Sequence, residues 1–454
     1  INKMTMFKHY VKVAIRQIKR SFLFSSINML GFVLGMTAAF LIYLWIVDEL
    51  TFEDFNKNGD YIYRVIREEQ SAKGQVPSTV TPLSGVFRKD FSKVENATFI
   101  KYGGKYDIYA GDVGVEANYG YVDTTFFDVF SFPVVAGDPS LLKKDPQMVV
   151  LSEAIAEKLF GKTSAIGKEV TCKFNKKYYK VAAVLKVPRK SHIQFEVLAS
   201  WDSYLWDEIK DELWGFSERM HVFIQLKKGT SLTDADRLAM RDLWVKHSQW
   251  GKPLAFQPLK DIHLRTAFKE PNDVYNHGNM QQIYLFAALA ALIIFMGAFN
   301  FMTLSTARAS LRSKEIGVRK VNGAKRKKLI IQYLSESLVQ AFISLLLALA
   351  LTELLLPFFN MFVEKDITLQ FNWQTLLFVL FGIVGVGCLA GSFSAFYMSS
   401  FSPLLAFKGG QATGKKGRLV KGLVCLQFVI AITMIICTTI IFKQLHYLQN
   451  ADLG

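Results

Sequence analysis

The feature that most constrains the fold is a long uncharged stretch near the N-terminus. No Asp, Glu, Lys or Arg occurs from Ser21 to Val47. A helix of this length crosses the roughly 30 Å hydrocarbon core of a bilayer, because each residue adds about 1.5 Å. The stretch is too long for a signal peptide and has no small-residue cleavage pattern before its acidic exit. We therefore expect a permanent membrane anchor.

Further apolar runs follow in the C-terminal part of the chain. With a hydrophobic fraction of 51%, they predict an α-helical polytopic membrane protein with about five transmembrane helices. The predicted spans are residues 21–47, 283–304, 337–359, 375–397 and 422–442.

The net charge of +16 is concentrated in short segments beside the apolar runs. Residues 48–282 carry 32 basic and 32 acidic side chains, whereas residues 1–20, 308–328 and 398–421 carry six, nine and five basic ones. A nucleic-acid-binding protein would collect basic residues on one folded face, so we expect no nucleic-acid partner. The positive-inside rule instead places the basic segments in the cytoplasm and residues 48–282 outside it.

The segments outside the spans and the charge-balanced region can also be assigned. Residues 1–20 have apolar and basic side chains on opposite helix faces and predict an amphipathic interfacial helix, with a soluble basic helix as the alternative. Residues 305–334 and 398–421 are predicted cytoplasmic segments, and 443–454 would begin a second extracytoplasmic region.

The charge-balanced segment 48–282 predicts one inserted α+β domain. Strands are expected at 61–66 and 221–226, and a hairpin at 170–174 with 178–185. Ser152 is expected to cap a helix through Phe160. Thr233 and Asp236 form a capping-box pattern ahead of a helix through His247.

Five small or polar residues inside the spans are candidates for helix packing. Gly31 with Gly35 and Gly387 with Gly391 form G-x-x-x-G pairs, which allow helices to approach closely; chance glycines are the alternative. Asn300 is expected to hydrogen-bond to a neighbouring helix, or else to reach interfacial water.

Glu336 and Glu353 bracket the apolar centre of the third predicted span. Carboxylates inside a membrane are costly, so they suggest proton or substrate handling. The alternative, favoured by their positions near the ends of the span, is interfacial placement or pairing with a basic loop residue.

The residues that could carry catalysis do not form a recognisable site. Gly161-Lys162-Thr163 lacks the earlier glycine of a phosphate-binding loop, since Ala156 stands there. The seven histidines and four cysteines show no metal-ligand spacing. We expect no catalytic residue, no metal and no cofactor bound by this chain.

Residues 305–337 read STARASLRSKEIGVRKVNGAKRKKLIIQYLSES. This stretch resembles the signature loop of MacB/FtsX-type ABC permeases. The stretches DELTFEDFNKNGDYIYRV, VDTTFFDVFSFPVVAGDPSLL, VVLSEAIAEKLFGKTSAIGK and FSPLLAFKGG resemble other parts of the same family, including its MacB-like periplasmic core domain. The arrangement is similar to the first half of the long duplicated permeases plus the first span of the second half.

The resemblance implies a permease in the bacterial cytoplasmic membrane, with its large domain in the periplasm or outside the cell. A separate cytoplasmic ABC ATPase would bind ATP and Mg²⁺, and the permease would transmit the ATPase's movement to the outer domain. Gly323 suits a helix C-cap, and a short new helix from Ala324 would then contact the ATPase. The implied coupling residues are Glu315, Gly317, Arg319, Gly323, Ala324 and Lys325.

Three functions fit these expectations. The first is export or extraction of an amphipathic or lipid-linked substrate. The second is FtsX-like signalling, in which the outer domain activates an extracytoplasmic partner such as a wall hydrolase without transport. The third is a sensory receptor, which leaves the last three spans unexplained. Membrane lipid and a second permease copy, or the missing second half, are further expected partners.

Overall fold

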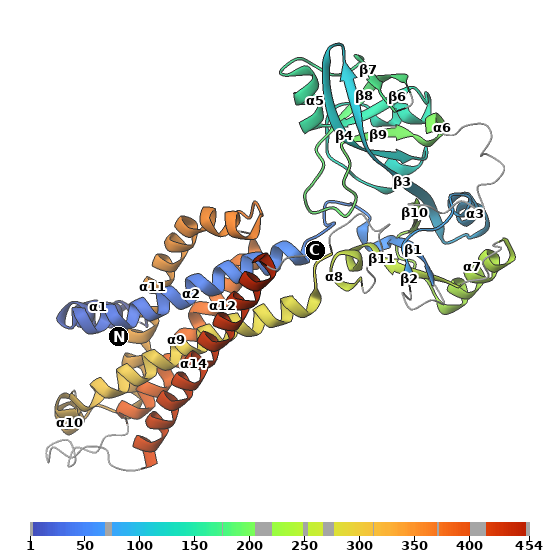
Figure 1. The fold of residues 1–454 in the computed structure, drawn as a ribbon. Coiled ribbons are helices and arrows are strands. Elements are labelled where there is room, and N and C mark those ends of the chain that lie inside the picture. The colour runs from blue at the N-terminus through green and yellow to red at the C-terminus, as the bar shows by residue number, and fades with distance from the viewer. Residues whose placement is uncertain are drawn as a thin grey trace. The chain divides into compact units, whose positions relative to one another are not determined.

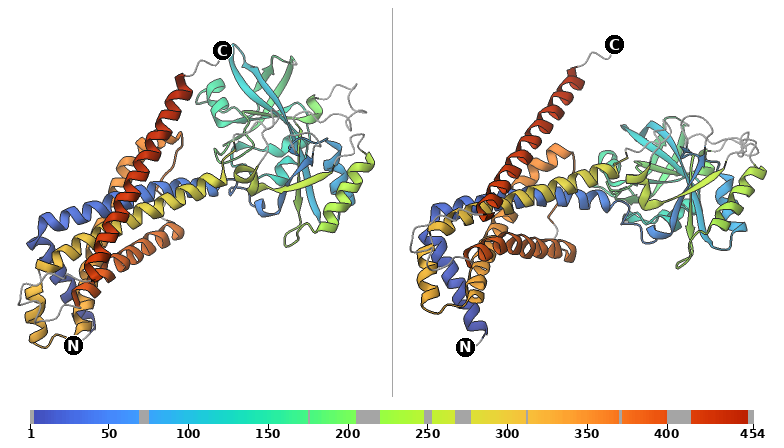
Figure 2. Two further views of the ribbon diagram at one scale, coloured as in Figure 1. Left: turned by 60° about the horizontal axis from the view of Figure 1, so that its bottom comes forward. Right: turned by 90° about the horizontal axis from the view of Figure 1, so that it is seen from below.

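A computed structural model gives the structure of the protein. It describes residues 3–68, 75–174, 176–204, 220–247, 253–266, 277–311, 313–369, 372–399 and 415–450. The chain divides into two compact units, which are described separately (Figures 1 and 2). The helical unit comprises Ile1–Asp48 and Gln281–Gly454, and the domain comprises Glu49–Met280.

The helical unit contains long apolar helices. Among the described residues, three helical segments are long and apolar enough to cross a membrane: Phe22–Leu50, Met280–Thr306 and Arg326–Val363. This confirms a polytopic helical membrane protein, while the total of about five spans stays a prediction. The helices are α1 (Lys3–Arg20), α2 (Phe22–Leu50), α9 (Met280–Leu311), α10 (Ser313–Val321), α11 (Arg326–Val363), α12 (Trp373–Ser399) and α14 (Lys415–Asn450).

Helices α2 and α9 run antiparallel. The rings of Phe32 and Phe301 stack with centroids 5.1 Å apart. Further along, Trp45 meets Phe286 edge-on at 4.9 Å. Residue numbers rise along α2 as they fall along α9, so the two helices cross the membrane in opposite directions.

Helices α2 and α11 run parallel. The Thr37 hydroxyl donates to the carbonyl oxygen of Ala348 at 3.3 Å, and Leu44 packs in one cluster with Leu356. Residue numbers here rise together. If α2 runs from the cytoplasm outward, α11 must therefore run outward too. This is expected, because α9 lies between them in the chain and runs in the opposite direction.

Helix α1 forms at the amphipathic N-terminal segment. Ala14 is buried, whereas Lys12, Arg16, Lys19 and Arg20 are exposed. This separation of apolar and basic side chains is typical of a helix lying along a membrane surface.

Among its described residues, the domain contains one mixed sheet of eleven strands, with the main order β11-β1-β10-β3-β4-β9-β6-β8-β5 (Figure 1). Strand β2 pairs with β1, and β7 pairs with β3 and β8. The strands are β1 (Ile62–Glu68), β2 (Gln75–Val76), β3 (Val94–Ala110), β4 (Val113–Val122), β5 (Val134–Gly137), β6 (Met148–Ser152), β7 (Glu169–Cys172), β8 (Lys177–Leu185), β9 (Val197–Ser200), β10 (Met220–Leu226) and β11 (Leu254–Pro258).

Short helices cover the sheet and its connections. They are α3 (Pro82–Asp90), α4 (Phe126–Val129), α5 (Glu153–Phe160), α6 (Trp201–Tyr204), α7 (Asp234–His247) and α8 (Ile262–Arg265), with 3₁₀ turns η1 (Gly59–Tyr61), η2 (Pro139–Lys143) and η4 (Leu259–Asp261).

The sheet carries a hydrophobic core on each face. In β10, Val222 and Ile224 belong to one core, while Phe223 between them belongs to the other. Successive strand side chains point to opposite faces, so a strand that is buried throughout contributes to both cores. β10 is therefore a central strand of the domain.

Several local predictions for the domain are confirmed. Strands β7 and β8 form the antiparallel hairpin, with Thr171 opposite Tyr178. The Ser152 hydroxyl accepts from the backbone N–H of Ile155 at 3.3 Å and caps α5. The predicted capping box also forms, since the backbone N–H of Thr233 donates to the Asp236 carboxylate at 2.8 Å and that of Asp236 donates back to the Thr233 hydroxyl at 3.3 Å.

Candidate functional site

A helix C-cap is formed around Gly323 at the end of α10. Gly323 has a φ of +83°. Its N–H donates to the carbonyl of Lys320, and the N–H of Ala324 donates to that of Arg319, both at 3.0 Å. This pair of bonds is a Schellman motif, which needs the left-handed conformation that glycine adopts without strain. The chain therefore turns sharply at Gly323.

The prediction of a short helix from Ala324 is wrong. Lys325 is extended, with φ −68° and ψ 141°, and the next residue begins α11, which continues for 38 residues. The sequence after Lys325 is rich in helix formers and has no proline before Pro357, so nothing ends a helix early. The short helix is α10, which lies before Gly323, and α11 continues from the basic segment through the predicted span.

Helix α10 packs against α11 and α12 through a small apolar core. Ile316 is fully buried and lies in one cluster with Leu329, Tyr333 and Ala395. Ile316 comes from α10, Leu329 and Tyr333 from α11, and Ala395 from α12. The cluster therefore holds α10 against the first turns of α11.

A chain of hydrogen bonds also links α10 to α11. The guanidinium of Arg319 donates through Nη1 to Oε1 of Gln332 at 2.9 Å. Gln332 in turn donates through Nε2 to Oε1 of Glu336 at 3.2 Å. Glu336 is buried, at 9% exposure. The side-chain amide of Gln332 thus links Glu336 to the basic residue Arg319.

Two basic residues bind the C-terminal end of α12. Nζ of Lys320 donates to the carbonyl oxygen of Ser399 at 2.7 Å, and Nε of Arg326 donates to its hydroxyl at 3.4 Å. Cations are favoured at helix C-termini, where carbonyl groups lack partners. Burial, and secondarily the nearby Arg326, lowers the pKa of Lys320.

The opposite side of α10 is open. Val318 and Val321 are 48% and 67% exposed, and they share a helix face because they are three residues apart. Lys325 is also exposed. We call Val318, Val321 and Lys325 the α10 surface. Gly317 is buried, and the side chain of Glu315 lies outside the described part of the structure.

The predicted packing residues Gly31 and Asn300 face each other. A Cβ atom on Gly31 would lie 2.9 Å from Nδ2 of Asn300. A Cβ on Gly35 would lie 3.6 Å from the carbonyl oxygen of Ile293, which is an ordinary contact. Both glycines of α2 therefore lie against α9, and a side chain at position 31 would have less space than one at position 35.

The second glycine pair lies between α12 and α11. A Cβ on Gly387 would lie 2.8 Å from Cδ2 of Leu338, and one on Gly391 would lie 2.8 Å from Cβ of Ser337. Numbers fall along α12 as they rise along α11, so these helices are antiparallel. The small residues allow the close approach that supplies packing energy in lipid.

Glu353 lies in a different setting from Glu336. Its side chain is exposed on α11. It lies one turn before Pro357, whose missing N–H deprives the Glu353 carbonyl of its usual helical donor. The structure does not bring the two predicted acids together.

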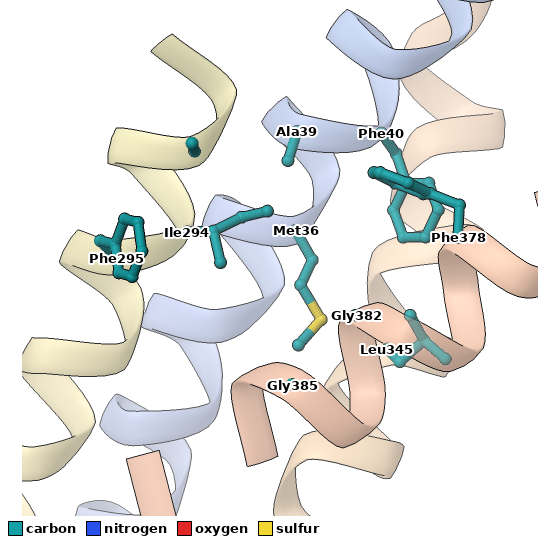
Figure 3. Close-up of a pocket in the computed structure, with 10 residues that line it drawn as sticks. Met36, Ala39, Phe40, Ile294, Phe295, Leu345, Phe378, Gly382 and Gly385 are labelled. Atoms are coloured by element: carbon teal, nitrogen blue, oxygen red, sulfur yellow. The ribbon is translucent and has the colours of Figure 1, made fainter. Parts of the chain in front are cut away.

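A cavity of about 240 Å³ lies between α2, α9, α11 and α12 (Figure 3). Its lining is almost wholly apolar. Figure 3 shows Met36 extending from α2 toward the helix that carries Gly382 and Gly385. The lining residues are Met36, Ala39, Phe40, Ala291, Ile294, Phe295, Leu345, Phe378, Gly382 and Gly385.

Sequence reasoning missed this cavity. In the sequence, the only indication of it is a set of small residues in three separate apolar segments. These segments are neighbours only in the folded structure, where the helices pack together. Within the described ranges, no group of three or more His, Cys, Asp or Glu side chains is placed to hold a metal ion. The expectation of no bound metal stays a prediction.

Comparison with known families places these features in context. Residues 25–239 match the MacB-like periplasmic core domain, and residues 287–404 match the FtsX-like permease C-terminal region. The chain belongs to the MacB/FtsX-like family of ABC transporter permeases. A member of this family is a multi-pass membrane protein with an extracytoplasmic domain, here Glu49–Met280.

Curated MacB/FtsX-like relatives share modest identity with the chain. The macrolide export ATP-binding/permease protein MacB of Neisseria gonorrhoeae (strain ATCC 700825 / FA 1090) is 23% identical over 286 residues, which are 62% of this chain and 42% of the relative. That of Campylobacter jejuni (serotype O:23/36, strain 81-176) is 23% identical over 233 residues, 51% and 34% of the two chains. The chain thus spans less than half the length of these relatives.

Two solved structures are similar to part of the chain. The periplasmic region of MacB from Actinobacillus actinomycetemcomitans is 15% identical, with 45% of this chain and 91% of that chain covered and a TM-score of 0.35. The extracellular domain of the ABC-type transporter YknZ is 14% identical, with 43% and 99% covered and a TM-score of 0.32.

Proposed function

We propose that this permease is driven by a separate cytoplasmic ABC ATPase, which holds ATP and Mg²⁺, and that it transmits the ATPase's movement to its extracytoplasmic domain. The result would be export or extraction of an amphipathic or lipid-linked substrate at the bacterial cytoplasmic membrane. One observation carries the proposal. The basic helix α10 is fixed to the first turns of a single helix, α11, that continues through the predicted span.

The α10 surface has the chemistry of a docking site for a soluble subunit. It combines two exposed valines with the exposed Lys325 on a segment whose charge predicts a cytoplasmic location. An apolar centre with a charged rim is the usual composition of a protein–protein contact. Burying Val318 and Val321 would supply affinity, and Lys325 would add orientation.

The contacts behind α10 support mechanical transmission. A displacement of α10 must move Ile316, which is enclosed by residues of α11 and α12. Arg319 adds a hydrogen bond to Gln332 of α11. Close-packed groups transmit strain because they have no space into which to relax. The expected consequence is that α10, α11 and α12 move together.

The cavity supports an amphipathic substrate. Its apolar lining lies among helices that are predicted to cross the bilayer, where an acyl chain or another apolar group would be available. The name of the curated relatives, macrolide export proteins, also favours export. The alternative is FtsX-like signalling, in which the outer domain activates an extracytoplasmic partner and no apolar site between the helices is required.

The proposal is tested by charge substitution on the α10 surface. The double variant Val318→Glu and Val321→Glu should abolish ATPase association and ATP hydrolysis stimulated by the permease, because it places two acids in the buried centre of the contact. Both side chains are exposed, so folding should be preserved.

The matched control is Leu238→Glu with Val245→Glu, two valine- or leucine-to-acid changes on exposed positions of α7. Membrane complexes of the native chain and both variants would be purified, and their ATP hydrolysis rates compared. Equal rates and equal ATPase content in all three preparations would contradict the proposed docking site.

A further inference from the structure

Both ends of the domain meet at one histidine. Glu49, in the last turn of α2, begins the domain, and Gly278 lies just before α9 begins at Met280. Nε2 of His263, from α8, lies 2.5 Å from Oε2 of Glu49. A Cβ on Gly278 would lie 2.9 Å from each of these two atoms. The entering and leaving segments thus meet at this contact.

This contact is buried and closely packed. Glu49 and His263 are 7% and 6% exposed. The ring of Phe52 stacks on His263, with centroids 3.8 Å apart and planes at 14°. The next histidine along the chain, His277, has its Nδ1 2.8 Å from the carbonyl of Ile262 in the same short helix. We call Glu49, Phe52, His263 and Gly278 the neck.

A second buried pair follows four residues after Glu49. Glu53 is 1% exposed, and its Oε1 lies 2.8 Å from Nδ1 of His192. Its other oxygen accepts from Nδ2 of Asn56 at 2.8 Å, and Oδ1 of Asn56 accepts from the N–H of Ser131 at 3.0 Å. The two glutamates therefore attach the first residues of the domain to α8 and to the loops before β9 and β5.

Glu53 also has a left-handed backbone, with φ +64°. A non-glycine residue in this conformation is strained and persists where the surroundings hold it in place. Here the backbone N–H of Glu53 donates to the carbonyl of Lys190 at 2.9 Å. The direction of the chain as it leaves α2 is therefore fixed by hydrogen bonds at both side chain and backbone.

Buried ionisable pairs are poor sources of stability compared with apolar packing. A function in transmission accounts for their placement better than a function in stability. The hydrogen bond between the carboxylate and the imidazole is directional. Removing one of the two groups costs free energy, because the other stays buried without this bond.

We propose that the neck, with the Glu53–His192 pair behind it, is the attachment through which displacement of α2 and α9 reaches the domain. This inference rests on the proposed function, because it requires nucleotide-driven movement of the helices. Glu49 and His263 act here as positioning residues. They set the direction in which the domain follows the two helices and bind no substrate.

The test measures movement of the domain directly. Spin labels would be placed by Met361→Cys, at the end of α11, and Leu238→Cys, on α7, in a chain with its native cysteines replaced. Both positions are exposed, at 77% and 48%. The distance between the labels would be measured in the full permease–ATPase complex, without nucleotide and with ATP trapped by vanadate.

Glu49→Ala should abolish the nucleotide-dependent change in label distance and leave ATP hydrolysis in place. Glu49→Gln should restore the change, because its amide can still hydrogen-bond to His263. Glu116→Ala removes a carboxylate from an exposed pair with Lys105 and should match the native chain. Thermal unfolding would be recorded for every variant.

Gly278→Ala provides a second route if Glu49→Ala does not fold. Its methyl group would push the two bonded atoms apart, and it too should abolish the change. A full distance change in a folded Glu49→Ala or Gly278→Ala variant would overturn the role of the neck. No change in the native complex would overturn the proposed function as well, so the two failures are distinguishable.

Discussion

Gly31 of α2 faces Asn300 of α9 so closely that a methyl group on the glycine would lie 2.9 Å from the amide nitrogen of Asn300. The contact lies within a helix pair that runs antiparallel from Phe32 and Phe301 to Trp45 and Phe286. It brings together two residues that the sequence predicted separately as packing positions.

Gly31→Val should therefore separate α2 from α9. The Cβ atom and two methyl groups of valine exceed the space at this position. Overpacking of this kind typically costs about 1–3 kcal/mol. The measurement is the midpoint of thermal unfolding in detergent. Gly382→Val is the control, since a Cβ there meets nothing within 4 Å. Equal midpoints for both variants would contradict the close α2–α9 contact.

Gly323→Ala should weaken coupling to the ATPase. Alanine is strained at φ +83°, and the loss of the Schellman turn should cost about 1 kcal/mol and misdirect α10 relative to α11. Gly323→Asn should be milder, because asparagine tolerates the left-handed conformation. The readout is ATP hydrolysis by the purified complex. If Gly323→Asn and Gly323→Ala lose equal ATP hydrolysis activity, the backbone conformation at this position is not the cause of the loss.

Asp123 should make the domain less stable as the pH rises. Burial raises its pKa from 3.8 to about 6, although hydrogen bonds from Thr98 and Thr125 act in the opposite direction. The folded state therefore binds the proton more tightly than the unfolded state. The resulting stability is present below about pH 4 and is lost as the pH rises through 6, by on the order of 3 kcal/mol at most.

Asp123→Asn keeps the acceptor oxygen and removes the titration. Its free energy of unfolding should lack the fall between pH 4 and 6 that we expect for the native chain. Tryptophan fluorescence during denaturant unfolding at several pH values provides the measurement. Identical pH profiles for the two chains would show that Asp123 does not titrate in this range.

Asp236 should have the opposite pH dependence. Lys93 is the main cause that lowers its pKa to about 2, helped by the bonds from Thr233. A lowered carboxyl pKa gives stability that is present above pH 3.8 and is lost as the pH falls through 2. Lys93→Met should remove part of this stability at neutral pH, by less than about 1 kcal/mol, because the pair is partly solvated. A Lys93→Met variant with an unchanged acid transition would contradict the assignment.

Filling the cavity between the helices should separate transport from ATP hydrolysis. Gly382→Leu places a side chain where the glycine faces open space. Transport of an amphipathic substrate by proteoliposomes should fall, while ATP hydrolysis continues. Gly422→Leu, at another open glycine, should leave transport unchanged. Equal transport by both variants would remove the cavity from the substrate path.

The sequence carries local signals well and long-range pairings poorly. The Ser152 cap and the β7–β8 hairpin depend on residues within one or two turns, and both were predicted. The parallel pairing of β4 with β9 joins strands that are far apart in the chain, and no local pattern specifies it. The neck has the same difficulty, because Glu49 and His263 are 214 positions apart.

The error at Ala324 has a different cause. The prediction of Gly323 as a helix C-cap is confirmed and places a helix before it, but its residue type does not say how long the following helix is. The structure resolves this through the apolar contacts of Ile316, which hold α10 in place before the turn. The FSPLLAFKGG stretch and most of the predicted linker 398–421 lie outside the described residues.

The proposed orientation has α10 facing the cytoplasm and the domain facing outward, and the proposed function depends on it. It is tested by labelling a chain without native cysteines with a membrane-impermeant maleimide, after Lys325→Cys or Lys105→Cys, in spheroplasts. Both lysines are exposed. The position-105 variant should react in intact spheroplasts, whereas the position-325 variant should react only after the membrane is opened. Reaction of the position-325 variant in intact spheroplasts would rule out this orientation, because a cytoplasmic ATPase could not then reach α10.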